Sequence, residues 1–215
     1  MSVHDTRTFI KYIIEGTLIE REKNTLEATR NFLCRRFTAN RNPEKKFIYT
    51  PDIKEEQKHA LTEFINENNF WIKENFGAER FLIQGGEAKI YLGMDNRSVI
   101  KFNDAVYYNT WLDFFNSLLI HNVLFEQTGY ELLGFRENEN ILYAVLKQVF
   151  VTSDGIVDLN DVKKLLAFNG FENIQRNDYY NKELGIILED IHDENVIANS
   201  NMLFFIDTVF YIHVT

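Results

Sequence analysis

The sequence predicts an α+β protein in which an α-helical N-terminal region, residues 1–78, precedes a β-rich domain, residues 79–215. Apolar residues recur at helical spacing over residues 4–39 and again over residues 52–75. From Phe81 onward, short apolar runs bounded by turn residues are typical of strands. The change in period separates the two regions.

The helical region contains one clear break. Asn40-Arg41-Asn42-Pro43 interrupts the first helical stretch, and Thr50-Pro51-Asp52 has the pattern of a helix start with Pro in the first turn. No residue pattern here is typical of a catalytic site. We therefore expect the apolar faces of these helices to pack against the later domain or against a partner.

The β-rich domain is predicted to begin with three strands, followed by a helix and two more strands. A further helix, ended by Gly170, follows later in the chain. The predicted elements are strands within residues 81–102, a helix near 108–126, strands at 132–135 and 141–146, and a helix at 159–167.

Composition restricts the class of protein. The chain has 215 residues and a net charge of −9, which argues against general binding to nucleic acid, because such binding neutralises many phosphates. Cys34 is the single cysteine, so an intramolecular disulfide is excluded and a reducing, cytoplasmic environment fits. No apolar run approaches the length of a membrane span. We expect a cytoplasmic protein without a membrane partner.

One stretch departs from the acidic average. It contains six cations with only Glu44 opposing them, and we interpret it as the solvated face of a helix and its following linker; the alternative is a contact with nucleic acid or an acidic partner. The cations are Arg30, Arg35, Arg36, Arg41, Lys45 and Lys46.

Three polar residues near the C-terminus have a spacing typical of phosphoryl transfer. Asp190 follows an apolar run, Asn195 comes five residues later, and Asp207 ends the next apolar run. In kinases a carboxylate orients the acceptor hydroxyl, while an amide and a second carboxylate hold the Mg²⁺ that bridges the ATP phosphates. The pattern predicts Asp190 as the catalytic base and Asn195 with Asp207 as metal ligands. Taken singly, Asp190 and Asn195 could each be an ordinary turn residue or helix cap, whereas a carboxylate at Asp207 needs a cation or hydrogen bonds.

A second set of residues lies upstream. The turn Gly85-Gly86-Glu87-Ala88 joins two predicted strands, and Lys101 follows two β-branched residues on the third. Glycine lets the backbone approach phosphate oxygens, and a Lys in this place reaches the α- and β-phosphates. We therefore predict that the turn and Lys101 bind nucleotide phosphates. The acidic partner of Lys101 stays open among Glu87, Asp113 and Glu126.

These motifs resemble those of known kinases. The Asp190-x-His192-x-x-Asn195 loop resembles aminoglycoside- and choline-type kinases, and the glycine turn resembles the G-x-E-A loop of small atypical kinases. From Gly85 to Ile212 the chain is similar to the kinase domain described in bacterial polyvalent proteins of mobile genetic elements. The landmarks of that similarity are residues 85–91, 99–104, 119–125, 132–135, 189–196 and 205–211.

The resemblance implies a protein-kinase-like fold of two lobes with a reduced C-lobe. The N-lobe would span residues 79–147, the hinge 147–151 and the C-lobe 152–215, with ATP and Mg²⁺ bound between the lobes. Gln148 and Val149, in the hinge, would present backbone groups to the adenine edge. His121, in an apolar helix, is expected to be a buried hydrogen-bonding residue, and His192 is expected to hydrogen bond within the catalytic loop.

Departures from the kinase pattern leave the function open. Leu188 and Glu189 replace the His and Arg of the H-R-D motif, and Thr208-Val209 replaces the usual Phe-Gly. Only eight residues follow Asp207, so we expect no activation segment. The first hypothesis is an ATP-dependent phosphotransferase with an unknown acceptor. The alternatives are a catalytically silent pseudokinase that binds a protein partner and, resting on the basic stretch, a nucleic-acid-associated factor.

Overall fold

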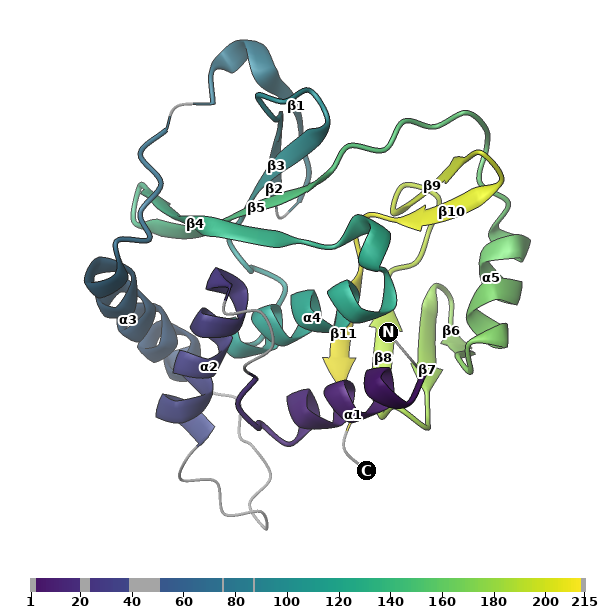
Figure 1. The fold of residues 1–215 in the computed structure, drawn as a ribbon, viewed down its shortest axis with the longest axis horizontal. Coiled ribbons are helices and arrows are strands. Elements are labelled where there is room, and N and C mark those ends of the chain that lie inside the picture. Colours follow the sequence, from purple (N-terminus) through teal and green to yellow (C-terminus); the bar gives the residue numbers. More distant parts are fainter. Residues whose placement is uncertain (1–2, 20–23, 39–50, 75, 87, 214–215) are drawn as a thin grey trace. The chain divides into compact units, whose positions relative to one another are not determined.

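The computed structural model describes residues 3–19, 24–38, 51–74, 76–86 and 88–213 (Figure 1). Helices combine with antiparallel sheets, which confirms the predicted α+β class. The helices are α1 Val3–Ile14, α2 Thr25–Thr38, α3 Pro51–Asn68, α4 Trp111–Leu124 and α5 Leu159–Phe168, with short 3-10 helices η1 Ala78–Arg80 and η2 Glu126–Thr128. The strands are β1 Phe81–Gln84, β2 Ala88–Leu92, β3 Ser98–Asn103, β4 Glu131–Asn138, β5 Ile141–Val149, β6 Glu172–Gln175, β7 Asp178–Asn181, β8 Ile186–Glu189, β9 Val196–Asn199, β10 Met202–Phe205 and β11 Val209–Ile212.

The chain divides into two compact units. One, here called the five-stranded unit, comprises Gly16–Asn116 and Tyr130–Phe150. The other, called the C-terminal unit, comprises Met1–Glu15, Ser117–Gly129 and Val151–Thr215. Helix α4 contributes to both, because the division falls between Asn116 and Ser117.

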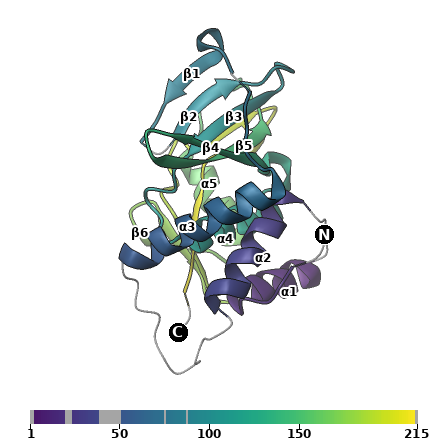
Figure 2. The same cartoon turned by 90° about the vertical axis from the view of Figure 1, so that its left-hand side faces the viewer.

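The five-stranded unit is built on an antiparallel sheet of order β1-β2-β3-β5-β4. Its central strand β3 is buried along its whole length, so both of its faces are covered. Phe76 packs on the face that carries Ile100, Phe102 and Val145. Figure 2 shows α2 beside α3, and Phe32 of α2 stacks on Phe64 of α3 with 4.4 Å between ring centroids.

Two helix boundaries have local causes. Helix α3 begins at Pro51, as the turn chemistry predicts, but it ends at Asn68 because Asn69 adopts a left-handed conformation with φ of 56°. Helix α4 begins at Trp111, after Thr110, whose hydroxyl accepts a hydrogen bond from the Asp113 N–H at 3.0 Å. This is the hydrogen bond of an N-cap residue. The Asp113 carboxylate accepts from the same hydroxyl at 2.8 Å.

The basic stretch lies partly within the described residues, and Arg30 corrects the expectation of a solvated face. Its side chain is 0 % exposed, and its guanidinium donates to the Asn116 Oδ1 at 3.0 Å and to the Thr17 carbonyl. These hydrogen bonds satisfy the buried cation. Arg36 does lie at the surface and pairs with Glu63 at 2.9 Å. Arg41, Lys45 and Lys46 lie outside the described residues.

The C-terminal unit contains a four-stranded antiparallel sheet of order β11-β8-β7-β6 and a separate hairpin of β9 and β10. The second half of α4 packs on these elements, and the Ser117 hydroxyl accepts a hydrogen bond from the Phe210 N–H of β11 at 2.9 Å. Phe125, just after α4, stacks on Phe205 of β10 with 4.2 Å between centroids. The sheet and the hairpin together position the loop that contains Asp190.

Candidate active site

The loop between β8 and β9 holds Asp190 in a strained backbone conformation. Asp190 has φ of 61°, a region that side-chain-bearing residues rarely adopt, and its side chain is 66 % exposed. The Asp178 carboxylate accepts a hydrogen bond from the Asp190 N–H at 3.1 Å, and the Asn177 carbonyl accepts from the Ile191 N–H at 3.0 Å. These bonds hold the backbone in this conformation and offset the strain.

Asn195 joins the two ends of this loop. Its Nδ2 donates to the Asp190 carbonyl at 2.8 Å, and its own carbonyl accepts from the Ile206 N–H at 3.0 Å. Ile206 directly precedes Asp207, so Asn195 connects the candidate base with the segment that carries the second candidate ligand. With Nδ2 facing Asp190, Oδ1 is the atom of Asn195 left to bind a cation.

His192 lies inside the same loop, as expected. Its Nδ1 accepts from the Glu194 N–H at 3.2 Å, so the neutral ring carries its proton on Nε2. Nε2 lies 3.5 Å from the Asp190 Oδ2. Nε2 is also 3.1 Å from the Asn195 Nδ2, but both nitrogens bear hydrogen in this tautomer. The Nε2 edge of the imidazole therefore faces both Asp190 and Asn195.

Asp207 is half-buried and sits between two anchored neighbours. Before it, the Phe205 carbonyl accepts from the Thr128 hydroxyl at 2.6 Å. After it, the Thr208 hydroxyl lies 2.7 Å from His121 Nδ1. His121 is 0 % exposed, which confirms that it is a buried hydrogen-bonding residue. Both contacts hold the backbone on which Asp207 is placed.

At the start of the loop, Glu189 lies near two other carboxylates, those of Asp178 and Asp190, which disfavour its charged form. Partial burial raises the pKa of Glu189, and the charges of Asp178 and Asp190 raise it further. Glu189 occupies the position where protein kinases carry an Arg. The loop therefore concentrates negative charge, which a cation would offset.

In the five-stranded unit, the predicted glycine turn closes a hairpin. The Gly85 N–H donates to the Ala88 carbonyl at 2.9 Å, and β1 and β2 pair with Gln84 opposite Lys89. A Cβ on Gly86 would lie 2.6 Å from the Tyr107 hydroxyl, so this residue passes close under an exposed aromatic side chain. Glu87 lies outside the described residues.

Lys101 is 5 % exposed on β3, opposite Ile90 of β2 and Leu146 of β5. Its Nζ lies 5.4 Å from the centroid of the Tyr130 ring, which is the distance of a cation–π contact. Because side chains alternate along a strand, Lys101 shares a face with Val99 and lies opposite to Phe102. Few lysines are buried to this degree without a structural or chemical reason.

The two candidate hinge residues end strand β5. Gln148 pairs with Val99 and Val149 pairs with Ser98 in the ladder with β3, while β4 begins opposite Lys147. The chain leaves the sheet at Phe150, whose N–H donates to the Arg97 carbonyl at 2.9 Å.

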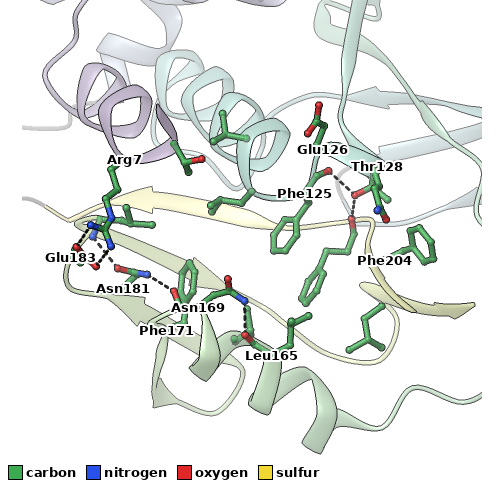
Figure 3. A pocket seen from close by; sticks show the side chains of 18 residues that line it. Arg7, Phe125, Glu126, Thr128, Leu165, Asn169, Phe171, Asn181, Glu183 and Phe204 are labelled. Carbon is green, nitrogen blue, oxygen red and sulfur yellow. Dashed lines mark hydrogen bonds and ion pairs between the residues drawn. The ribbon is translucent and has the colours of Figure 1, made fainter. Parts of the chain in front are cut away.

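A cavity of about 520 Å³ lies in the C-terminal unit, and Glu126, one of the candidate partners of Lys101, is among its lining residues (Figure 3). Apolar side chains such as Phe125, Leu165 and Phe204 line it, and the ion pair of Arg7 with Glu183 stands at one side. None of the three candidate catalytic or metal residues is among its lining residues.

Two functional contributors carry no local signal in the sequence. Asp178 holds the Asp190 backbone from twelve residues away, and Thr128 holds the Phe205 carbonyl from 77 residues away. Asp and Thr are common residue types, so only the hydrogen-bond partners of Asp178 and Thr128 identify their role. Within the described segments, no group of three or more His, Cys, Asp or Glu side chains converges to hold a metal.

Comparison with models of protein families matches residues 54–214 to serine/threonine/tyrosine kinases found in polyvalent proteins. The match spans most of the chain, so the chain belongs to this kinase family, as its motifs indicate. No curated protein matches the chain. No solved structure matches it either. None of the helices in the described segments combines the length and apolarity that a bilayer crossing requires.

Proposed function

We propose that the protein is a minimal phosphotransferase that binds ATP with Mg²⁺ and moves the γ-phosphoryl group to an acceptor hydroxyl. In this proposal the Gly85-Gly86 turn and Lys101 bind phosphate oxygens, and Gln148 and Val149 contact the base. Asp190 accepts the acceptor's proton, and Asn195 with Asp207 binds the metal. Kinase family membership supports this chemistry, and positioning with charge neutralisation would supply most of the rate.

The observation that carries the proposal is the 2.8 Å hydrogen bond from Asn195 Nδ2 to the Asp190 carbonyl. An exposed carboxylate in a left-handed backbone needs such support to keep one orientation. Because Nδ2 donates to the Asp190 carbonyl, the Asn195 amide oxygen is the atom left to bind a cation.

The residues present fit a magnesium ion. Mg²⁺ prefers oxygen ligands and usually takes one or two from the protein, the rest coming from phosphates and water. The Asn195 oxygen and the Asp207 carboxylate are donors of this kind. When bound, the metal would neutralise charge on the phosphates. The negative charge of Asp178, Glu189 and Asp190 provides a further electrostatic reason for a cation nearby.

The test is a thermal shift with ATP, with and without Mg²⁺, on the wild type and on variants. A ligand at a hundred times its Kd adds about 2.7 kcal/mol to the folded state. We expect Asp207→Ala to lose the Mg²⁺-dependent part of the shift, and Lys101→Met to lose the nucleotide shift in both conditions. Loss in both variants would mean that the two sets of residues act on one nucleotide.

Asp193→Ala is the matched control, because it removes an exposed carboxylate from the same loop. It should leave both shifts unchanged. Asp190→Ala should bind nucleotide but lose phosphoryl transfer by about a hundredfold or more. Absence of any shift in the wild type, or full transfer by Asp190→Ala, would contradict the proposal.

A second candidate function is a pseudokinase that binds a partner through the C-terminal unit. The cavity of about 520 Å³ favours it, because the volume lies in the range of ligand sites and its lining excludes the catalytic residues. ATP binding without turnover, together with a partner whose capture is lost on Leu165→Arg, would support this function. Turnover of ATP that depends on Asp190 would exclude it.

A further inference from the structure

A second hollow lies on the five-stranded sheet, on the face opposite to Lys101. Its volume is about 200 Å³. Phe102 lines it, and Phe102 follows Lys101 on β3, so the two side chains point to opposite faces. The lining residues are Phe76, Lys89, Tyr91, Phe102, Arg136, Asn138 and Tyr143. The proposed nucleotide residues therefore do not account for this hollow.

Two cations converge over the middle of the sheet. Lys89 on β2 places Nζ 5.9 Å from the ring centroid of Tyr143 on β5. Arg136 on β4 places Cζ 5.9 Å from the ring centroid of Phe102 on β3. In the strand order β1-β2-β3-β5-β4, each side chain reaches across one intervening strand toward the other. The charges thus approach each other from opposite sides.

No carboxylate neutralises this pair within the described part of the chain. Arg136 donates to the main-chain carbonyl of Glu74 at 3.2 Å, and neither Lys89 nor Arg136 forms an ion pair there. Both side chains are half-buried, where repulsion between like charges is stronger than in bulk water. The chain carries 32 acidic and 23 basic residues, so an unneutralised pair of cations is unexpected. An anion bound between them would remove the repulsion.

Aromatic rings form the floor of the hollow. Phe76 and Tyr91 each contact Phe102 edge to face, both with 5.4 Å between centroids. Asn138 and the phenols of Tyr91 and Tyr143 supply hydrogen-bonding groups at the rim. The volume is below the ~300 Å³ at which sites for drug-sized ligands begin. A ligand of this site is therefore small, flat and anionic.

We propose that this hollow binds a phosphate monoester carried on a single planar ring, with Lys89 and Arg136 as the phosphate ligands. Arg136 can donate two parallel hydrogen bonds to phosphate oxygens, and Lys89 adds a second charge. The ring packs on the aromatic floor. A phosphotyrosine side chain presents this chemistry.

The test is calorimetric titration of the full chain with phenyl phosphate. We expect saturable binding that weakens about tenfold or more in Lys89→Gln and in Arg136→Gln, since each removes a charge-assisted contact. Arg136→Lys keeps the positive charge and should bind phenyl phosphate more tightly than Arg136→Gln. This result would show that the loss in Arg136→Gln comes from the missing charge and not from a folding defect. Circular dichroism and thermal melts check that each variant is folded.

Matched controls remove the same charges elsewhere. Arg97→Gln and Lys182→Gln, both at exposed positions, should bind phenyl phosphate like the wild type. Lys101→Met should also bind normally, which separates this hollow from the proposed nucleotide site. Loss of binding in Lys101→Met, or unchanged binding in both Lys89→Gln and Arg136→Gln, would overturn the proposal.

Further ligands define the chemistry. Inorganic phosphate should bind more weakly than phenyl phosphate, and phenol should not bind measurably; equal affinity for inorganic phosphate would overturn the role of the ring. In the Lys101→Met background, O-phosphotyrosine should bind more tightly than adenosine monophosphate, whose phosphate is carried on ribose and whose base is a fused bicycle. Failure of O-phosphotyrosine to bind, or tighter binding of adenosine monophosphate, would overturn the proposal.

Discussion

His121 Nδ1 lies 2.7 Å from the Thr208 hydroxyl, and this contact ties the segment after Asp207 to helix α4. The His121 Nε2 donates to the Thr128 carbonyl at 2.9 Å, so the ring is the neutral Nε2–H tautomer and Nδ1 accepts from Thr208. Thr128 in turn donates to the Phe205 carbonyl. One network of hydrogen bonds thus holds the chain on both sides of Asp207.

Replacing His121 should damage stability and metal binding together. His121→Ala leaves the buried Thr208 hydroxyl and Thr128 carbonyl without the imidazole, and we expect a loss of about 2–4 kcal/mol. Urea unfolding measures it. Thr208→Val, which removes one hydrogen bond, should cost less. If Asp207 binds Mg²⁺, the Mg²⁺-dependent thermal shift should also fall in both variants; an undiminished shift would show that the network does not position Asp207.

Asn195→Asp should disrupt the loop although it retains an oxygen ligand. The replaced amide now presents an acceptor to the Asp190 carbonyl, so a hydrogen bond becomes a repulsion, at a cost of about 1–3 kcal/mol. Asn199→Asp is the control, because Asn199 Nδ2 also donates to a carbonyl, that of Thr152, at 2.7 Å. Both variants should lose stability, but only Asn195→Asp should lose phosphoryl transfer. Equal transfer by the two would refute the role of Asn195.

Gly134→Ala should destabilise the five-stranded unit. A Cβ there would lie 2.3 Å from the Phe70 carbonyl, which is main chain and accepts a hydrogen bond from the Phe135 N–H. The backbone must shift, and we expect a cost of about 1–3 kcal/mol. Gly155→Ala, where a Cβ meets nothing within 4 Å, should change stability by less than about 0.5 kcal/mol. Chemical denaturation of the two variants compares them, and equal midpoints would contradict the steric argument.

Glu189→Gln should stabilise the protein at neutral pH. The pKa of Glu189 is raised above its ordinary value of 4.5, so the folded state holds the proton more tightly than the unfolded state. Its contribution to stability is therefore lost as pH rises from about 4.5 through the raised pKa. The gain at pH 7 should be at most about 1 kcal/mol, because solvent screens a half-exposed group.

The comparison is between unfolding free energies of Glu189→Gln and wild type from pH 4 to pH 8. The difference should grow with pH and level off at neutral pH. Glu172→Gln, at an exposed site on β6, is the control and should show no such trend. A constant difference across the range would contradict the assignment of the burial and charge effect to Glu189.

Much of the fold follows from local patterns. Turn chemistry predicts the start of α3 at Pro51, and strand periodicity predicts β4 and β5, although the connection expected at residues 136–140 is shortened to residues 139–140 because β4 continues to Asn138. Asp190 and Asn195 are five residues apart, and this spacing indicates that they lie in one loop. In the structure the Asn195 Nδ2 donates to the Asp190 carbonyl within that loop. The helical spacing of apolar residues up to residue 75 did not predict the end of α3 at Asn68, where Asn69 turns left-handed and the next residues, Phe70 and Ile72, pair with Phe135 of β4.

Sequence alone indicated the kinase family, the order of the elements from β1 to α5 and the candidate catalytic residues, since these depend on residue types at short spacing. Tertiary structure decided which residues are buried and which partners hold them. Arg30 belongs to a basic stretch in the sequence, yet its guanidinium is interior because Asn116 and the Thr17 carbonyl satisfy it. Lys89 and Arg136 lie 47 residues apart and meet only because the strand order brings them over one sheet face. Contacts between distant residues carry no period in the sequence, so only the folded chain reveals them.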